Sequence, residues 1–195
     1  MSYVIDQTPN EWRRAVEAWL FGLDLVSPAT RELIVTAWQS TWSSSPFNAI
    51  DEAPWDAVAF DYTLADHVNE VTRAGLNLAD HVEKEWQVKL DPEILVPILI
   101  LHDVDKPLMF VRENGVVKRT ALYHEIPHGV VGGMLLKELG FPHHVVATVT
   151  THSPRMPFPG RSWEAYVLHY ADYLVCDHAM MRAGQKPFYF FHDVE

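Results

Sequence analysis

The sequence has 195 residues, 48% of them hydrophobic and 12% aromatic, which is enough to bury a sizeable core and too little for several large domains. Its formal net charge of −11 argues against a surface for long nucleic acid, because such surfaces are basic, although a few local cations would suffice for a small anionic substrate. A single cysteine, a start without a secretory pattern and no apolar run of about 18 residues predict a cytoplasmic protein with neither an intramolecular disulfide nor membrane contact.

Two helices are predicted near the N-terminus. The first begins with Thr8 as its expected N-cap. The second has Ser27 as its cap and Pro28 at its first position, where proline is favoured. A segment rich in Ser, Pro and Asp follows at 43–56 and is predicted to be a loop. We therefore expect an N-terminal helical layer at about 8–45 ahead of the main body.

Most of the remaining chain is also predicted to be helical. Apolar residues recur at helical spacing over 64–86, and "DPEILVPILILHD" is so apolar on every side that it predicts a buried helix ending near Asp103. The Asn-Gly of "RENGVVKRT" indicates either a hairpin or an extended loop. Further helices are expected over "HGVVGGMLLKELG", over "PHHVVATVTTHS" and, after the Pro-rich loop "SPRMPFPGRS", from a cap at Ser162 to Gly184. The predicted fold class is all-α, with one domain over 1–195.

Several His and Asp residues fall where helical periodicity predicts the interior or a helix end. Asp172, for example, lies on the apolar face of its helix with Leu168 and Val175, and His152 aligns with Val149. Taken singly, each of these residues fits a hydrogen-bonded core group, but basic partners are scarce on these faces. Neutral imidazoles and carboxylates are ligands of divalent transition metals, so a metal site is predicted. The candidate ligands are His67, His102, Asp103, His128, His152 and Asp172.

The order and local context of these residues resemble the HD superfamily of metal-dependent phosphohydrolases. "HDVDK" is similar to the family's His-Asp-x-x-Lys, and "HYADYL" is similar to the context of its last Asp. "HGVVGGMLL" and "VTTHSPR" place His128 and His152 at the positions of two further histidines, which occur in the subset of the superfamily with two metals. The resemblance covers about 60–180 and implies an HD-domain-like helical bundle with an N-terminal helical extension.

The resemblance also implies a role for each candidate ligand. Asp103 would bridge two ions of a divalent transition metal, namely iron, manganese or cobalt, with magnesium as a further option. One site would be completed by His67, His102 and Asp172, and the other by His128 and His152. A two-metal site of this kind suits hydrolysis of a small phosphate ester, such as a nucleotide-type phosphomonoester or phosphodiester, by a metal-activated water.

Four other residues are candidates for supporting roles. Lys106, three residues after Asp103, would hold a substrate phosphate and act in catalysis, or else it is a solvated lysine at a helix end. Arg155 is a second candidate contact to the substrate anion, or else an exposed loop arginine. His124 and Glu125 would carry a proton, or would contact the metal ligands and hold them in position without binding an ion themselves.

Two other classes of protein share parts of this pattern. Some members of the superfamily with the same six ligands hold a mixed-valence di-iron centre and use O₂ to cleave a C–C or C–P bond. A regulatory or scaffold protein with a degraded site is a third interpretation, but the complete ligand set argues against it. "HGVVGG" and "ADYL" are closer to the hydrolases, so hydrolysis is the preferred prediction. The aromatic tail at 187–193 would pack on the bundle or on another subunit of a homo-oligomer.

Overall fold

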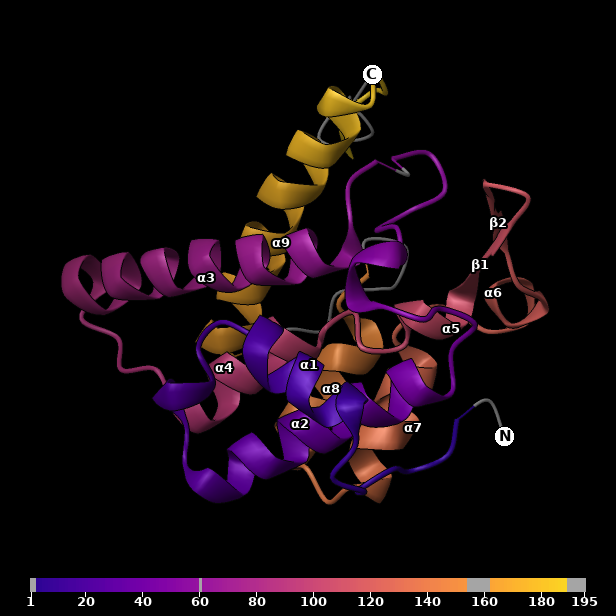
Figure 1. Ribbon diagram of the computed structural model, residues 1–195. Coiled ribbons are helices and arrows are strands. Elements are labelled where there is room, and N and C mark those ends of the chain that lie inside the picture. Colours follow the sequence, from indigo (N-terminus) through magenta and orange to yellow (C-terminus); the bar gives the residue numbers. More distant parts are fainter. Residues whose placement is uncertain (1–2, 60, 154–161, 189–195) are drawn as a thin grey trace.

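Helices form most of the computed structural model, which describes residues 3–59, 61–153 and 162–188 (Figure 1). The predicted all-α class, with helices that precede the main body, is confirmed, and the division of the chain at about 8–45 and 60–180 stays a prediction. No helix in the described ranges is both long and apolar enough to cross a membrane. In chain order the elements are α1 (Glu11–Trp19), α2 (Pro28–Ser43), α3 (Leu64–Trp86), α4 (Pro92–Leu101), α5 (Lys106–Met109), β1 (Phe110–Glu113), β2 (Val116–Arg119), α6 (Ala121–Glu125), α7 (Val130–Glu138), α8 (His143–Thr151) and α9 (Trp163–Arg182), with short 3₁₀ turns at Leu23–Leu25 and Ile50–Glu52.

The N-caps of the first two helices show how neighbouring polar residues compete for the same backbone groups. Ser27 caps α2 as predicted, because its hydroxyl accepts the backbone N–H of Thr30. The prediction that Thr8 caps α1 is wrong. The Thr8 hydroxyl donates instead to Asp6 at 2.7 Å, and Asn10 accepts the N–H of Arg13 at the start of the helix.

The N-terminal helices are joined to the main body through tryptophans. Trp38 and Trp42 of α2 are fully buried, and the Trp38 ring packs edge-on against Trp19 of α1 at 4.8 Å between centroids. The Trp38 indole N–H donates to the carbonyl of Ile100 in α4 at 3.2 Å. This bond satisfies a polar group that would otherwise be buried without a partner, and it ties the N-terminal helices to the helix that leads into the His-Asp pair.

Helix α4 occupies the centre of the bundle. Every residue from Leu95 to Leu101 is buried, as its uniformly apolar sequence predicts, and α2, α3, α8 and α9 all pack around it. Helix α3 approaches closely at Gly75, where a Cβ atom would lie 2.3 Å from a methyl group of Leu99. The chain leaves α4 through a turn at 102–105, so His102 and Asp103 follow directly from the core.

The segment after this turn adds a small antiparallel sheet to the helical fold. Strands β1 and β2 form a hairpin in which Phe110 pairs with Arg119 and Glu113 with Val116. Asn114 and Gly115 both have positive φ, as a two-residue hairpin turn requires, so of the two alternatives for this segment the hairpin is confirmed. The hairpin projects from one side of the bundle beside α6 (Figure 1).

Helices α7 and α8 pack against each other at unusually short range. A Cβ at Gly133 would lie 2.0 Å from the hydroxyl oxygen of Thr150, and one at Gly129 would lie 2.7 Å from the carbonyl oxygen of Val149. Gly129 also has a φ of +91°, which side chains rarely tolerate. These glycines bring the start of α7 next to the end of α8, where His128 and His152 lie.

Candidate metal centre

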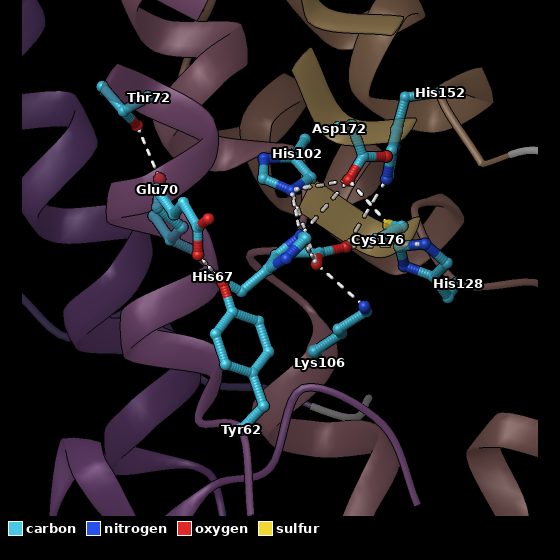
Figure 2. Close-up of polar contacts among 12 residues, drawn as sticks. Tyr62, His67, Glu70, Thr72, His102, Lys106, His128, His152, Asp172 and Cys176 are labelled. Carbon is cyan, nitrogen blue, oxygen red and sulfur yellow. Dashed lines mark hydrogen bonds and ion pairs between the residues drawn. The ribbon is translucent and has the colours of Figure 1, made fainter. Parts of the chain in front are cut away.

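All six predicted ligand residues come together in space, and five of them are provided by helix ends or the turns beside them. His67 lies in the first turn of α3, His102 and Asp103 directly follow α4, His128 precedes α7, and His152 follows α8. Asp172 alone comes from the middle of a helix, α9. Figure 2 shows the side chains of His67, His102 and Asp172 pointing toward one another, with His128 and His152 beside them.

The first group consists of two imidazoles and two carboxylates with almost no exposure to solvent. The Nε2 atoms of His67 and His102 are 3.1 Å apart. His67 Nε2 is also 3.2 Å from Asp103 Oδ2 and 3.2 Å from Asp172 Oδ1. His102 Nε2 lies 3.4 Å and 3.7 Å from the same two oxygens. These four atoms therefore surround one point, and their separations are those expected for ligands about 2.0–2.2 Å from a shared ion.

The second group uses the other oxygen of Asp103. Asp103 Oδ1 is 3.5 Å from His128 Nε2 and 3.5 Å from His152 Nε2. His152 is buried, whereas 18% of the His128 side chain is exposed. The carboxylate of Asp103 thus presents one oxygen to each group of side chains, as a ligand between two ions would.

Two of the histidines are held in the orientation that frees Nε2 to bind an ion. Nδ1 of His102 lies 2.9 Å from the carbonyl oxygen of Leu99, and Nδ1 of His152 lies 2.7 Å from that of Val149. A carbonyl oxygen can only accept, so Nδ1 carries the proton and Nε2 keeps a lone pair in the neutral ring. In both cases the acceptor belongs to the residue three positions earlier, at the end of a helix where carbonyls lack a helical partner.

The electrostatics of the site favour positive charge at its centre. Burial raises the pKa of Asp103, but Lys106 and His102 outweigh this effect and hold it well below the usual range. Burial likewise raises the pKa of Asp172, yet the contacts with His67 and His102 leave it lowered. Both groups are therefore carboxylates at neutral pH. The pKa of His102 is raised, because attraction to Asp103 outweighs the effect of burial.

The donor set fits a divalent transition metal. It combines imidazole nitrogens with carboxylate oxygens, and the single Lys106 ammonium offsets only one of the two buried carboxylate charges. Cys176 is adjacent, but its sulfur donates to Asp172 Oδ1 at 3.2 Å, and burial raises the pKa of the thiol well above its usual value. The thiol is therefore protonated in the metal-free protein, and the two candidate ligand groups among the described residues consist of histidines and aspartates.

Lys106 is part of this cluster rather than a solvated lysine. Its ammonium nitrogen is 2.8 Å from Asp103 Oδ2 and 4.7 Å from the centre of the Trp55 ring. The residue is 8% exposed and begins α5, so the alternative of a solvated lysine at the end of a helix is wrong. Figure 2 shows Lys106 pointing to the same place as the histidines.

A cavity of about 290 Å³ opens above the cluster. Asp103, His128 and Asp172 line one part of it, and aromatic and aliphatic side chains line much of the rest. Its basic lining residues in the described ranges are Lys106 and Arg119. The Arg119 guanidinium lies 4.6 Å from the centre of the Tyr123 ring. The cavity can therefore admit a small anionic molecule to the cluster.

The other predicted site residues are placed differently. His124 and Glu125 are exposed on α6, and neither is among the residues that line the cavity. Arg155 lies outside the described residues.

Two contributors near the site were not predicted. Asp105 is completely buried, and its carboxylate contacts His128 and the start of α7. Trp55 lies over the ring of His67, with centroids 5.2 Å apart. The second Asp of "HDVDK" was the available signal for Asp105, whereas a tryptophan in an irregular segment gave none.

A helical bundle that gathers histidines and aspartates at its helix ends defines a candidate metal-dependent enzyme. Residues 64–176 match the family described as "HD domain", which is more than half of the 195 residues. The chain belongs to this family, so the predicted membership of the HD superfamily is confirmed. The matched range begins three residues before His67 and ends four residues after Asp172, so it contains all the candidate ligands.

The chain is also similar to a curated protein. The chain is 29% identical over 133 residues to the dihydroneopterin 2′,3′-cyclic phosphate phosphodiesterase of Methanocaldococcus jannaschii. The aligned region is 64% of this chain and 51% of that protein, so the chain spans about half the length of this relative. No solved structure matches the chain.

Proposed function

We propose that this protein is a metal-dependent phosphohydrolase that cleaves a phosphodiester of a small molecule. The observation that carries the proposal is that the two oxygens of the Asp103 carboxylate face different groups of histidines. Oδ2 faces His67 and His102, whereas Oδ1 faces His128 and His152. Membership of the HD family and the activity of the M. jannaschii relative support the same reaction class.

In this proposal the two groups of side chains hold two divalent ions. The first ion is bound by Asp103 Oδ2 with His67, His102 and Asp172, and the second by Asp103 Oδ1 with His128 and His152. Ions held in this way supply an activated water and offset the negative charge of the phosphoryl oxygens. The mixed nitrogen and oxygen ligands favour iron, manganese or cobalt, while magnesium, which prefers oxygen, is the less favoured option.

The surrounding side chains prepare the cavity for an anion. Lys106 brings a buried positive charge to the edge of the cluster, and the Trp55 ring confines it from one side. In this position the ammonium binds a phosphoryl oxygen of the substrate and helps to orient the ester toward Asp103 and its neighbours. We also retain Arg155 as a proposed contact to the substrate anion, because it follows His152 by three residues in the chain.

The dimensions and charge of the protein favour a small substrate over a polymer. The cavity holds about 290 Å³, near the lower end of the range for small-molecule sites, and the net charge of −11 would repel long nucleic acid. A cyclic phosphodiester attached to a compact organic group fits these limits. Dihydroneopterin 2′,3′-cyclic phosphate is the first compound to assay, and nucleoside 2′,3′-cyclic phosphates are the second.

The test compares hydrolysis and metal content on the same samples. Purified protein is stripped with a chelator, reconstituted separately with Mn²⁺, Co²⁺, Fe²⁺ or Mg²⁺ under argon, and assayed for opening of the cyclic phosphate. We expect hydrolysis that depends on the added metal and is lost in Asp103→Ala. Reconstituted protein that carries two ions and opens none of these esters would contradict the proposal. O₂ consumption by a mixed-valence di-iron form would indicate the oxygenase instead.

A further inference from the structure

Asp105 is a buried acidic residue for which the proposed reaction has no use. We propose that it is a positioning residue that fixes the tautomer and orientation of His128, and thereby creates the second metal position. This inference rests on the proposed function, because it assumes that His128 Nε2 binds an ion.

The contacts of Asp105 join three parts of the site. Its Oδ2 accepts the backbone N–H groups of Gly129 at 2.7 Å and Gly132 at 3.1 Å, at the start of α7. Its Oδ1 lies 3.4 Å from Nδ1 of His128. The residue has no exposed surface and belongs to the same turn as Asp103. One carboxylate therefore caps α7 and faces the ring that precedes this helix.

His128 needs such a partner because of its position in the chain. His102 and His152 each follow a helix and lie within hydrogen-bond distance of the carbonyl three residues earlier. His128 instead lies in the turn between α6 and α7, three residues after the end of α6, and its Nδ1 faces the Asp105 carboxylate rather than a backbone carbonyl. Asp105 takes the place of that carbonyl. A carboxylate only accepts, so Nδ1 of His128 must donate, and Nε2 then keeps its lone pair toward Asp103.

Close packing leaves the Asp105 carboxylate little freedom to move. A Cβ at Gly132 would lie 2.9 Å from a methyl group of Val104 and 3.7 Å from the carboxylate carbon of Asp105. A Cβ at Gly129 would approach the backbone of α8 and lie 3.4 Å from the ring of His152. The absence of side chains at these two positions lets the turn of Asp105, the start of α7 and the end of α8 meet.

The decisive variant is Asp105→Asn, which keeps the shape of the side chain and reverses the direction of its hydrogen bond with His128. Its amide oxygen can still accept the N–H groups of Gly129 and Gly132, whereas its NH₂ group then faces Nδ1 of His128. Turning the amide over would set the NH₂ group against two backbone N–H groups, so this orientation is disfavoured. Nδ1 must now accept, the ring proton moves to Nε2, and an ion can bind Nε2 only at the cost of breaking this hydrogen bond.

We expect Asp105→Asn to fold with a melting temperature close to that of the wild type in the metal-free state. Metal content should fall from about two ions per chain to about one, and affinity for the second ion should drop by about 10- to 100-fold. Imidazole ¹⁵N chemical shifts of the metal-free proteins should place the His128 proton on Nδ1 in the wild type and on Nε2 in the variant. That measurement does not depend on activity.

Two further variants separate positioning from general damage. Asp91→Asn changes another helix-capping carboxylate, which accepts the N–H of Glu93 at 2.9 Å at the start of α4, and should leave metal content unchanged. His128→Ala should lose the same ion as Asp105→Asn, and the double variant should lose no more than either single one.

The outcomes distinguish this inference from the proposed function. If Asp105→Asn keeps both ions at wild-type affinity, or if the tautomer of His128 does not change, the positioning role is wrong. Loss of both ions would also overturn it, because the effect would then not act through His128. If the wild type itself binds two ions but hydrolyses no phosphodiester, the proposed function fails while the role of Asp105 can still be measured by metal content.

Discussion

Replacing Lys106 by methionine tests whether a single buried charge serves the substrate. Methionine keeps an unbranched stem against Trp55 and removes the ammonium group that lies 2.8 Å from Asp103 Oδ2. A hydrogen bond to a charged group contributes about 1.5–3 kcal/mol, which corresponds to a factor of about 10–150 in an equilibrium or rate ratio. We therefore expect kcat/KM for the phosphodiester to fall by that factor while metal content stays unchanged.

The assay is steady-state kinetics on metal-loaded protein, with metal analysis of each sample. Lys118→Met is the matched control, because it removes an ion-paired lysine, 2.7 Å from Glu113, that is exposed on the hairpin. Lys106→Arg should also be impaired, since a planar guanidinium does not fit a site shaped around a compact ammonium. Wild-type kcat/KM in Lys106→Met with full metal content would refute the reasoning. A fall in metal content would mean that Lys106 supports Asp103 rather than the substrate.

Three further predictions concern the metals and the packing around them. Chelation should lower the melting temperature, because ligand at 100 times its Kd stabilises the folded state by about 2.7 kcal/mol, and an unchanged melt would speak against bound metal. Asp103→Ala should abolish activity and lose more metal than Asp172→Ala, since the bridging residue has two bonds to lose, and equal losses would argue against the bridge. Gly129→Ala should lower the urea midpoint more than Gly140→Ala, because both glycines have positive φ but only Gly129 faces a backbone oxygen at 2.7 Å, and equal shifts would contradict this.

The features of the site that follow from helical periodicity were accessible from the sequence. Asp172 interrupts the apolar face of its helix, and His152 continues the apolar face of another. Helical periodicity therefore predicts that both side chains lie in the protein interior. Asp105 lies in a turn, where periodicity says nothing about direction, and its role depends on backbone N–H groups 24 and 27 residues away. The burial of Lys106 was hard to foresee for a different reason, because lysine is almost never buried without a partner and that partner is itself one of the candidate ligands.

Competition between equivalent local signals accounts for the error at the N-terminus. Asp6, Thr8 and Asn10 are all residues that cap helices, and they alternate within five positions. Hydrogen bonds among these residues decide which of them caps the helix. The Asp6 carboxylate accepts hydrogen bonds from the Thr8 hydroxyl and the Asn10 side-chain amide. Asn10 still has its carbonyl oxygen free to accept the N–H of Arg13. The capping preference of each residue, taken alone, therefore does not predict which of the three caps α1.

The position of Trp55 gives the cluster an intrinsic optical reporter. The residue is 4% exposed, and the centre of its ring lies 4.7 Å from the Lys106 ammonium and 5.2 Å from the centre of the His67 ring. An open-shell ion bound at His67 would lie close enough to this indole to quench its emission, whereas a closed-shell ion such as Zn²⁺ or Mg²⁺ would not. Titration of the wild type beside Trp55→Phe isolates this indole from the six other tryptophans of the sequence. The occupancy of the first metal position can thus be followed in solution without any attached dye.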